Sequence, residues 1–382
     1  MQTSQVTRRP RRSTRGTALI SAVIVSGVVA AGAAFAQSAM PAPATKLAPL
    51  PDAPKIDEKR AALGAKLFFD ERLSGDTSTS CATCHDPAKG WGGKPLSDGY
   101  SSVSYFRNAP GLFNAAFRKR FMWDGRLDGS DGATLVRDMI TEAHFMNADT
   151  RLVQERLKQI PEYAEAFKAA FGGDPYGGSI YGSVAEFLKT IRTVDAPLDK
   201  FLRGDATALS DEQKAGMALF EGKAGCVACH SGATLSDGKQ HATGAPDHPD
   251  LGKDAERQLS MLRHYSTMGV PAFMNRRSDV GLYTVTKDDK DLGKFQTPSL
   301  WDVGQTAPYM HSGVFATLAQ VVDFYDAGGG VSPNKSSMLK PLGLTADEKK
   351  ALVAFLDAMT GAKPTVMRPK LPDMALREQG KN

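Results

Sequence analysis

The sequence repeats one short pattern, Cys-x-x-Cys followed directly by His, at residues 81–85 and again at 226–230, and these two copies contain all four cysteines. Four cysteines in an exported protein would also suit two disulfides, and a single pair would suit a redox dithiol or half a zinc site. The His after each pair favours a different chemistry. Two thiols about one helical turn apart form thioethers with a porphyrin, and the next imidazole ligates its iron. We therefore expect two covalent c-type haems, held by Cys81, Cys84 and His85 and by Cys226, Cys229 and His230.

The first 36 residues have the layout of a cleaved export signal. They contain five arginines and no acid, then an Ala- and Val-rich run, and they end on Ala34-Phe35-Ala36. A basic start, a short apolar run and a small-x-small end are typical of a secretory signal peptide; the alternative is a membrane anchor, for which the run is short. We expect cleavage after residue 36 and a periplasmic location, because c-type haem is attached after export.

Removal of the signal also removes the net charge. Five of the 47 basic residues and none of the 42 acidic residues lie in it, which leaves 42 of each sign. The basic balance therefore belongs to the signal, and we expect no nucleic-acid partner and no stable membrane insertion afterwards.

The hydrophobic periodicity predicts a mainly α-helical protein with two cytochrome c-like domains, each wrapped around one haem with long loops. Helices are expected over 57–70, 149–171 and 183–193, with Ser210 capping a helix to about Glu221 and Thr345 opening a last one. Residues 71–80, 86–111 and 231–300 are expected to be loops. The predicted division is 37–205 for the first domain, 206–360 for the second, and a tail at 361–382 that packs back on the first.

Several longer motifs resemble those of the bacterial di-haem cytochrome c peroxidases and their MauG-like relatives. The similarity runs from about residue 57 to 362 and rests on Leu63-Gly-Ala-Lys-Leu-Phe-Phe-Asp70, Leu73-Ser-Gly-Asp76, Arg107-Asn-Ala-Pro110, Trp123-Asp-Gly-Arg126, Thr297-Pro-Ser-Leu300 and Thr306-Ala-Pro-Tyr-Met-His-Ser-Gly313. The resemblance implies that peroxide reacts at the N-terminal haem and that the C-terminal haem relays electrons. It implies an electron relay through Trp123, which by residue type alone would be a core aromatic. It also implies a calcium ion held by Asn108, Thr306 and Pro308, whose oxygen donors suit a hard cation.

Two departures from the peroxidase pattern point towards the MauG-like branch. Many of these peroxidases have a His about sixteen residues after the first haem motif that caps the iron, but no His occurs here between His85 and His144. The resemblance therefore implies an open first iron. Fourteen residues after His311, where the peroxidases place an axial Met, this chain has Tyr325, as MauG-like proteins do. By residue type Tyr325 would be a core aromatic, whereas the aligned position implies a ligand to the second iron, with Met310 as the competing candidate.

The distal acid or base of the first haem stays open. The family keeps a Glu directly before a Met about twenty residues past the Trp, but here Phe145 stands at that place in Glu142-Ala-His-Phe-Met-Asn147. Glu142 or His144 could move the proton instead, and Glu142 is preferred. His144 could also ligate the first iron, which would close both haems.

These observations leave three candidate functions for the protein. The first is a periplasmic peroxidase that reduces hydrogen peroxide with electrons from a small cytochrome c or cupredoxin. The second is a MauG-like enzyme that oxidatively modifies a partner protein. The third is an electron carrier without catalytic activity.

Overall fold

The computed structural model describes residues 46–100, 104–363 and 368–373, and the expected export signal lies outside them. In this part the secondary structure is mainly helical, as predicted. Its four short strands form two antiparallel pairs. They pair β1 (Arg120–Phe121) with β2 (Leu127–Asp128) and β3 (Gln240–His241) with β4 (Phe295–Gln296). No helix of the described chain is long and apolar enough to cross a membrane.

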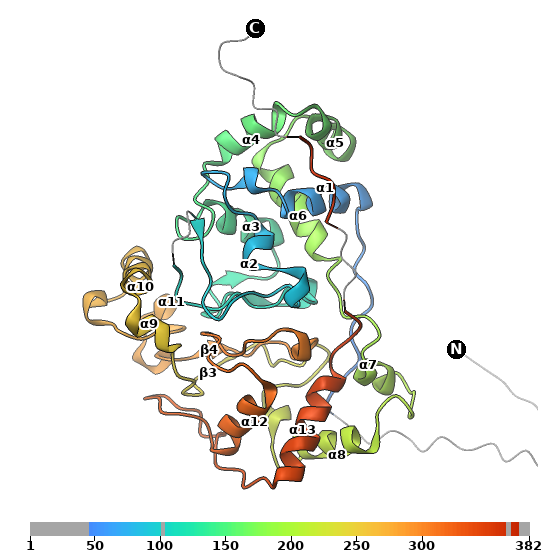
Figure 1. Cartoon of the computed structure of the whole chain (residues 1–382), viewed down its shortest axis with the longest axis vertical. Coiled ribbons are helices and arrows are strands. Elements are labelled where there is room, and N and C mark those ends of the chain that lie inside the picture. The colour runs from blue at the N-terminus through green and yellow to red at the C-terminus, as the bar shows by residue number, and fades with distance from the viewer. Residues whose placement is uncertain (1–45, 101–103, 364–367, 374–382) are drawn as a thin grey trace, which may run out of the picture. The chain divides into compact units, whose positions relative to one another are not determined.

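In the described part of the chain, six α-helices precede residue 190, and the first and last of them pack closely. The six helices are α1 (Glu58–Phe68), α2 (Cys81–Cys84), α3 (Gly132–Thr141), α4 (Thr150–Lys158), α5 (Pro161–Phe171) and α6 (Gly177–Leu188) (Figure 1). Gly64 in α1 makes the close contact possible, because a Cβ there would lie 1.9 Å from the Ser183 carbonyl oxygen in α6. The apolar faces of these helices form one cluster of buried residues between Leu63 and Ile191.

The second half repeats this arrangement with different helices. It contains α7 (Pro197–Leu202), α8 (Asp211–Glu221), α9 (Pro249–Lys253), α10 (Ala255–Thr267), α11 (Tyr283–Thr286), α12 (Leu318–Asp326) and α13 (Ala346–Ala358). Here α8 and α13 lie side by side (Figure 1), and a Cβ at Gly216 in α8 would lie 2.0 Å from the Ala351 carbonyl oxygen in α13. A second buried cluster joins these helices to Trp301 and Leu50.

The capping predictions were correct and two periodicity predictions were wrong. Ser210 and Thr345 begin α8 and α13, each with a reciprocal capping box. The single helix expected over 149–171 is two helices, because Pro161 has no N–H for the interior of a helix and instead begins α5. The helix expected over 183–193 begins earlier and ends at Leu188.

The largest disagreement lies in residues 231–300, which were expected to be loop but contain α9, α10 and α11. These helices form a third buried cluster, in which Met261 and Tyr265 of α10 pack with Tyr105 and Phe106. Near the C-terminus, the Pro372 carbonyl accepts a hydrogen bond of 2.9 Å from Arg72, and Leu371 packs against the first cluster. The domain boundaries at 205 and 360 remain predictions.

Candidate functional site

The two Cys-x-x-Cys-His motifs adopt closely similar local geometry. In each, the His backbone N–H donates to the carbonyl of the first Cys over 2.9 Å. His85 Nδ1 then lies 3.0 Å from the Trp91 carbonyl oxygen, and His230 Nδ1 lies 3.1 Å from that of Leu235. A ring whose Nδ1–H donates to a carbonyl carries its lone pair on Nε2, the tautomer that metal-ligating histidines use. Both histidines are thus prepared to ligate iron through Nε2.

The cysteines do not form disulfides and are poorly suited to dithiol chemistry. All four are free. Burial raises the pKa of Cys81 and of Cys226 to about 12, whereas a reactive dithiol needs a lowered pKa. Burial has the opposite effect on a base and lowers the pKa of His85 to about 4. Its imidazole is therefore neutral, the form that binds a metal.

A large, mainly apolar cavity lies against the first motif. Its wall includes Cys81, Cys84 and His85 together with apolar side chains of α3 and α6. Arg118 also lines it; burial lowers the pKa of this guanidinium to about 10, and no carboxylate of the described chain pairs with it. A buried cation without an acid partner is costly, and a haem propionate would supply the missing charge. The residues present therefore fit a covalent haem: the apolar side chains suit the porphyrin ring, and Arg118 suits a propionate.

The second motif lies close to Tyr325. Burial raises the pKa of the Tyr325 hydroxyl, and the neighbouring sulfurs of Cys226 and Cys229 act in the same direction. Helix α12 therefore places this phenol beside the atoms expected to hold the second haem. Met310, the competing ligand, stands in the loop before α12 in a left-handed backbone conformation.

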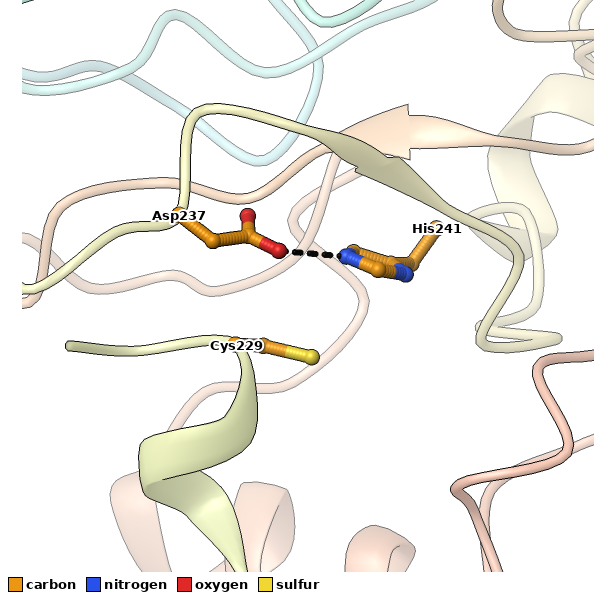
Figure 2. A group of neighbouring side chains, drawn as sticks. All are labelled: Cys229, Asp237 and His241. Carbon is orange, nitrogen blue, oxygen red and sulfur yellow. Dashed lines mark hydrogen bonds and ion pairs between the residues drawn. The ribbon is translucent and has the colours of Figure 1, made fainter.

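A second group of side chains lies next to Cys229 and was missed from the sequence. Figure 2 shows Cys229, Asp237 and His241, whose ligand atoms lie within 4.8 Å of one another, with His241 Nε2 2.8 Å from Asp237 Oδ2. This set resembles a metal site, but a sulfur used in a thioether is a weak metal ligand. Asp237 also lines the first cavity.

Trp123 lines the first cavity and contacts the second half of the chain through its backbone. Its side chain lines the first cavity, and its Nε1 donates to the Asn108 carbonyl over 2.9 Å. Its own carbonyl accepts from Gln296 N over 2.9 Å, and two residues further Pro298 places its carbonyl beside His230.

The structure links two of the expected calcium-binding segments. Asn108 N donates to the His311 carbonyl over 2.8 Å, and the Asn108 side-chain amide donates to Lys94 O over 2.7 Å, which leaves Oδ1 as its available oxygen. Within the described chain no hydrogen bond ends on the carbonyl oxygens of Thr306 or Pro308. Such unused oxygens suit a hard cation.

His144 and Glu142 take different places relative to the cavity. His144 lines the cavity wall, whereas Glu142 lies behind it, with Oε2 3.0 Å from His144 Nε2 and 3.1 Å from Arg126 Nη2. Burial by itself raises the pKa of Glu142, but His144 and Arg126 outweigh burial, so its net pKa is lowered and it stays ionised.

A buried ion-pair cluster is centred on Arg107, which also lines the cavity. This guanidinium contacts Asp279 at 2.5 and 2.8 Å and Asp124 at 2.6 Å, and Asp124 also pairs with Arg126 at 3.0 Å. Sequence reasoning included Arg107, Asp124 and Arg126 only as members of family motifs and gave them no role. It missed Asp279, because no local pattern pairs residues 172 positions apart.

Comparison with known proteins agrees with this geometry. A family profile described as di-haem cytochrome c peroxidase matches residues 58–207. The chain is 52% identical to the cytochrome-c peroxidase IdrP2 of Denitromonas iodatirespirans over 97% of this chain and 98% of that protein. It is 36% identical to the methylamine utilization protein MauG of Methylorubrum extorquens, covering 85% and 84% of the two chains. Among solved structures, a MauG-like protein associated with microbial copper homeostasis has a TM-score of 0.71 at 27% identity, over 85% of this chain and 98% of that one. The chain belongs to the di-haem cytochrome c peroxidase family and is a haem peroxidase of the cytochrome-c peroxidase type.

Proposed function

We propose that this enzyme reduces hydrogen peroxide in the periplasm at the first haem, held by Cys81, Cys84 and His85. The second haem, held by Cys226, Cys229 and His230, receives electrons from a small cytochrome c or cupredoxin. Each peroxide takes up two electrons and two protons and yields two waters. The haem iron supplies the redox chemistry when bound, and the protein must place the substrate and deliver the protons.

The observation that carries this proposal is the pair formed by His144 and Glu142 at the first cavity. Glu142 Oε2 lies 3.0 Å from His144 Nε2, and His144, rather than Glu142, lines the cavity in which peroxide would bind. An imidazole backed by a carboxylate is a common arrangement for moving a proton. In this proposal His144 shuttles the proton, and Glu142 and Arg126 hold the ring in place.

The test is a peroxide titration of the resting protein, followed at both haems by absorption and electron paramagnetic resonance. We expect one high-spin ferric centre that binds cyanide without prior reduction, reaction with peroxide, and return to the resting state when a small reduced cytochrome is added. Two low-spin centres and no reaction with peroxide would contradict the proposal, make His144 an iron ligand and favour an electron carrier.

The second candidate is a MauG-like enzyme that oxidatively modifies a partner protein. The position of Tyr325 beside both cysteines of the second motif favours it, because a phenolate ligand stabilises oxidised iron where Met would favour the ferrous state. In the same titration, an oxidised state that persists until a protein partner is added would support this candidate. Rapid turnover with a small cytochrome would support the first.

We further propose that one calcium ion binds Asn108 Oδ1 and the carbonyl oxygens of Thr306 and Pro308. Asn108 also accepts from Trp123 through its backbone carbonyl, so an ion there would fix the expected relay residue. Metal analysis of the purified protein before and after chelation tests this. Absence of calcium from fully active enzyme would contradict it.

A further inference from the structure

His264 lies in α10, the helix that the sequence analysis did not predict, and its ring contacts His144 at the first cavity. It is buried, with 3% of its surface exposed, and its Nε2 has no hydrogen-bond partner in the described chain. The nearest carboxylate oxygen is Asp124 Oδ2, 4.0 Å away, which is too far for a direct hydrogen bond. Buried polar atoms without partners are uncommon and are retained where they serve function.

The ring of His264 contacts His144 directly. The two ring centroids are 5.2 Å apart and the planes meet at 75°, while Tyr105 stacks on the same His144 ring at 5.3 Å with an angle of 10°. Phe106 packs against His264 at 5.5 Å. Phe145 also packs on the His144 ring, tilted by 51° at 4.4 Å, so this ring has three ring neighbours in addition to its 3.0 Å contact with Glu142.

The charge state of His264 suits a packing role beside a proton-carrying ring. Burial, and then the nearby Arg107, Arg126 and His144, lower its pKa well below the usual value, and Asp124 acts in the opposite direction. The imidazole is consequently neutral at neutral pH. A neutral ring does not repel a proton on His144, as a charged one would.

We propose that His264 is a positioning residue for the peroxide reaction, which holds the His144 ring in the wall of the first cavity with its Nε2 3.0 Å from Glu142 Oε2. The proposal rests on the proposed role of His144 in proton transfer. It assigns a function to α10, which supplies no residue to either haem motif. It also predicts that His264 acts only through His144.

The test uses the intact di-haem protein and the substitution His264→Phe, which keeps a flat ring but removes both nitrogens. The first readout is the association rate of cyanide with the resting first haem, because hydrogen cyanide must give up its proton to a nearby base when it binds iron. The second is the rate of reaction with peroxide. We expect both rates to fall by about tenfold to a hundredfold, as for other residues that orient a functional group through a contact.

Three comparisons make the result specific. Ser260→Ala is the matched control, because Ser260 is one turn away in α10, equally buried and also without a partner for its hydroxyl. It should leave both rates unchanged. In a His144→Phe background, His264→Phe should cause no further loss, since residues that act as a unit are not additive. His264→Gln, which retains hydrogen-bonding groups, replaces His264→Phe if that variant fails to bind two haems.

Rates within twofold of wild type in His264→Phe would overturn the proposal. So would an equally large fall in both rates when His264→Phe is added to His144→Phe. The cyanide readout separates this inference from the proposed function. If wild-type protein binds cyanide but ignores peroxide, the peroxidase proposal fails. In that case the cyanide association rates of wild type and His264→Phe still test the positioning role.

Discussion

At the scale of single residues, the choice between Tyr325 and Met310 as ligand of the second iron would set the reduction potential of that haem. A phenolate is anionic and hard, whereas a thioether favours ferrous iron, and axial-ligand identity is a principal determinant of haem potential. We expect Tyr325→Met to raise the potential of the second haem by on the order of 0.1 V, within the roughly 0.8 V range that axial ligands span. Spectroelectrochemical titration of the two haems measures this change.

Two further variants complete the test of Tyr325. Tyr325→Phe should leave an open second iron or recruit Met310. Tyr309→Phe is the matched control, since the Tyr309 hydroxyl donates to the Val303 carbonyl over 3.0 Å, and it should leave the potential unchanged. A long-wavelength sulfur-to-iron band in the wild-type ferric protein would show that Met310 is the ligand and that Tyr325 only packs.

At the scale of elements, one close helix contact recurs in both halves and depends on glycine. A Cβ at Gly64 would lie 1.9 Å from the Ser183 carbonyl oxygen and 2.9 Å from the Phe187 Cβ, so α1 and α6 would have to separate. We expect Gly64→Ala to destabilise the protein by about 1–3 kcal/mol, the usual cost of overpacking. Denaturant unfolding of the di-haem protein measures it.

The control for Gly64 lies in the partner helix. A Cβ at Gly182 in α6 would meet nothing within 4 Å, so Gly182→Ala should stabilise the helix by about 0.5–1 kcal/mol. Equal effects of the two substitutions would show that close packing of α1 on α6 does not limit stability.

The elements also show where sequence reasoning succeeds. Ser210 and Thr345 predicted two helix starts correctly, because a capping box is a local pattern. Helix α10 was missed, since its apolar residues Leu259, Met261 and Tyr265 are interspersed with charges and lie in a Gly- and Asp-rich stretch. The haem motifs could be found because five adjacent residues define them. The contact of His264 with His144 could not, because it joins residues 120 positions apart through the fold.

The Arg107 cluster links distant elements and should make stability depend on pH. Burial alone raises the pKa of Asp279, but Arg107 outweighs it, so the pKa is lowered. An acid with a lower pKa in the folded chain binds fewer protons there than in the unfolded chain. Its stabilisation is therefore complete above the usual value of about 3.9 and declines as the pH falls towards the folded-state value.

We expect Asp279→Asn to lower the free energy of unfolding by about 3–5 kcal/mol at pH 7, because it leaves Arg107 buried with one partner fewer. The difference from wild type should shrink below about pH 4, where the wild-type acids begin to take up protons. Urea unfolding at several pH values measures this. Asp52→Asn, at an exposed position, is the control, and a difference that stays constant down to about pH 3 would contradict the argument.

At the scale of the whole molecule, the proposed function requires electrons to pass between the two haem sites, and we propose Trp123 as a short path. Its ring lines the first cavity, its carbonyl accepts from Gln296, and Pro298 beyond that faces His230. One hydrogen bond and two residues of backbone therefore separate the Trp123 backbone from a carbonyl beside His230, the expected ligand of the second iron. Loss of the indole should affect transfer between the haems more than ligand binding at either one.

Trp123→Phe keeps a flat ring but removes both the indole and its hydrogen bond to Asn108. We expect electrons supplied at the second haem to reach the peroxide-treated first haem about tenfold more slowly, which corresponds to a barrier higher by about 1.4 kcal/mol. Stopped-flow absorption at the two haems measures this, and cyanide binding at the first haem should be unchanged. Trp301→Phe is the matched control, because Trp301 likewise donates its Nε1 to a backbone carbonyl, that of Ala233, but does not line the first cavity. If both variants transfer electrons at the wild-type rate, the path between the haems does not pass through Trp123, and the connection through Gln296 and Pro298 is structural only.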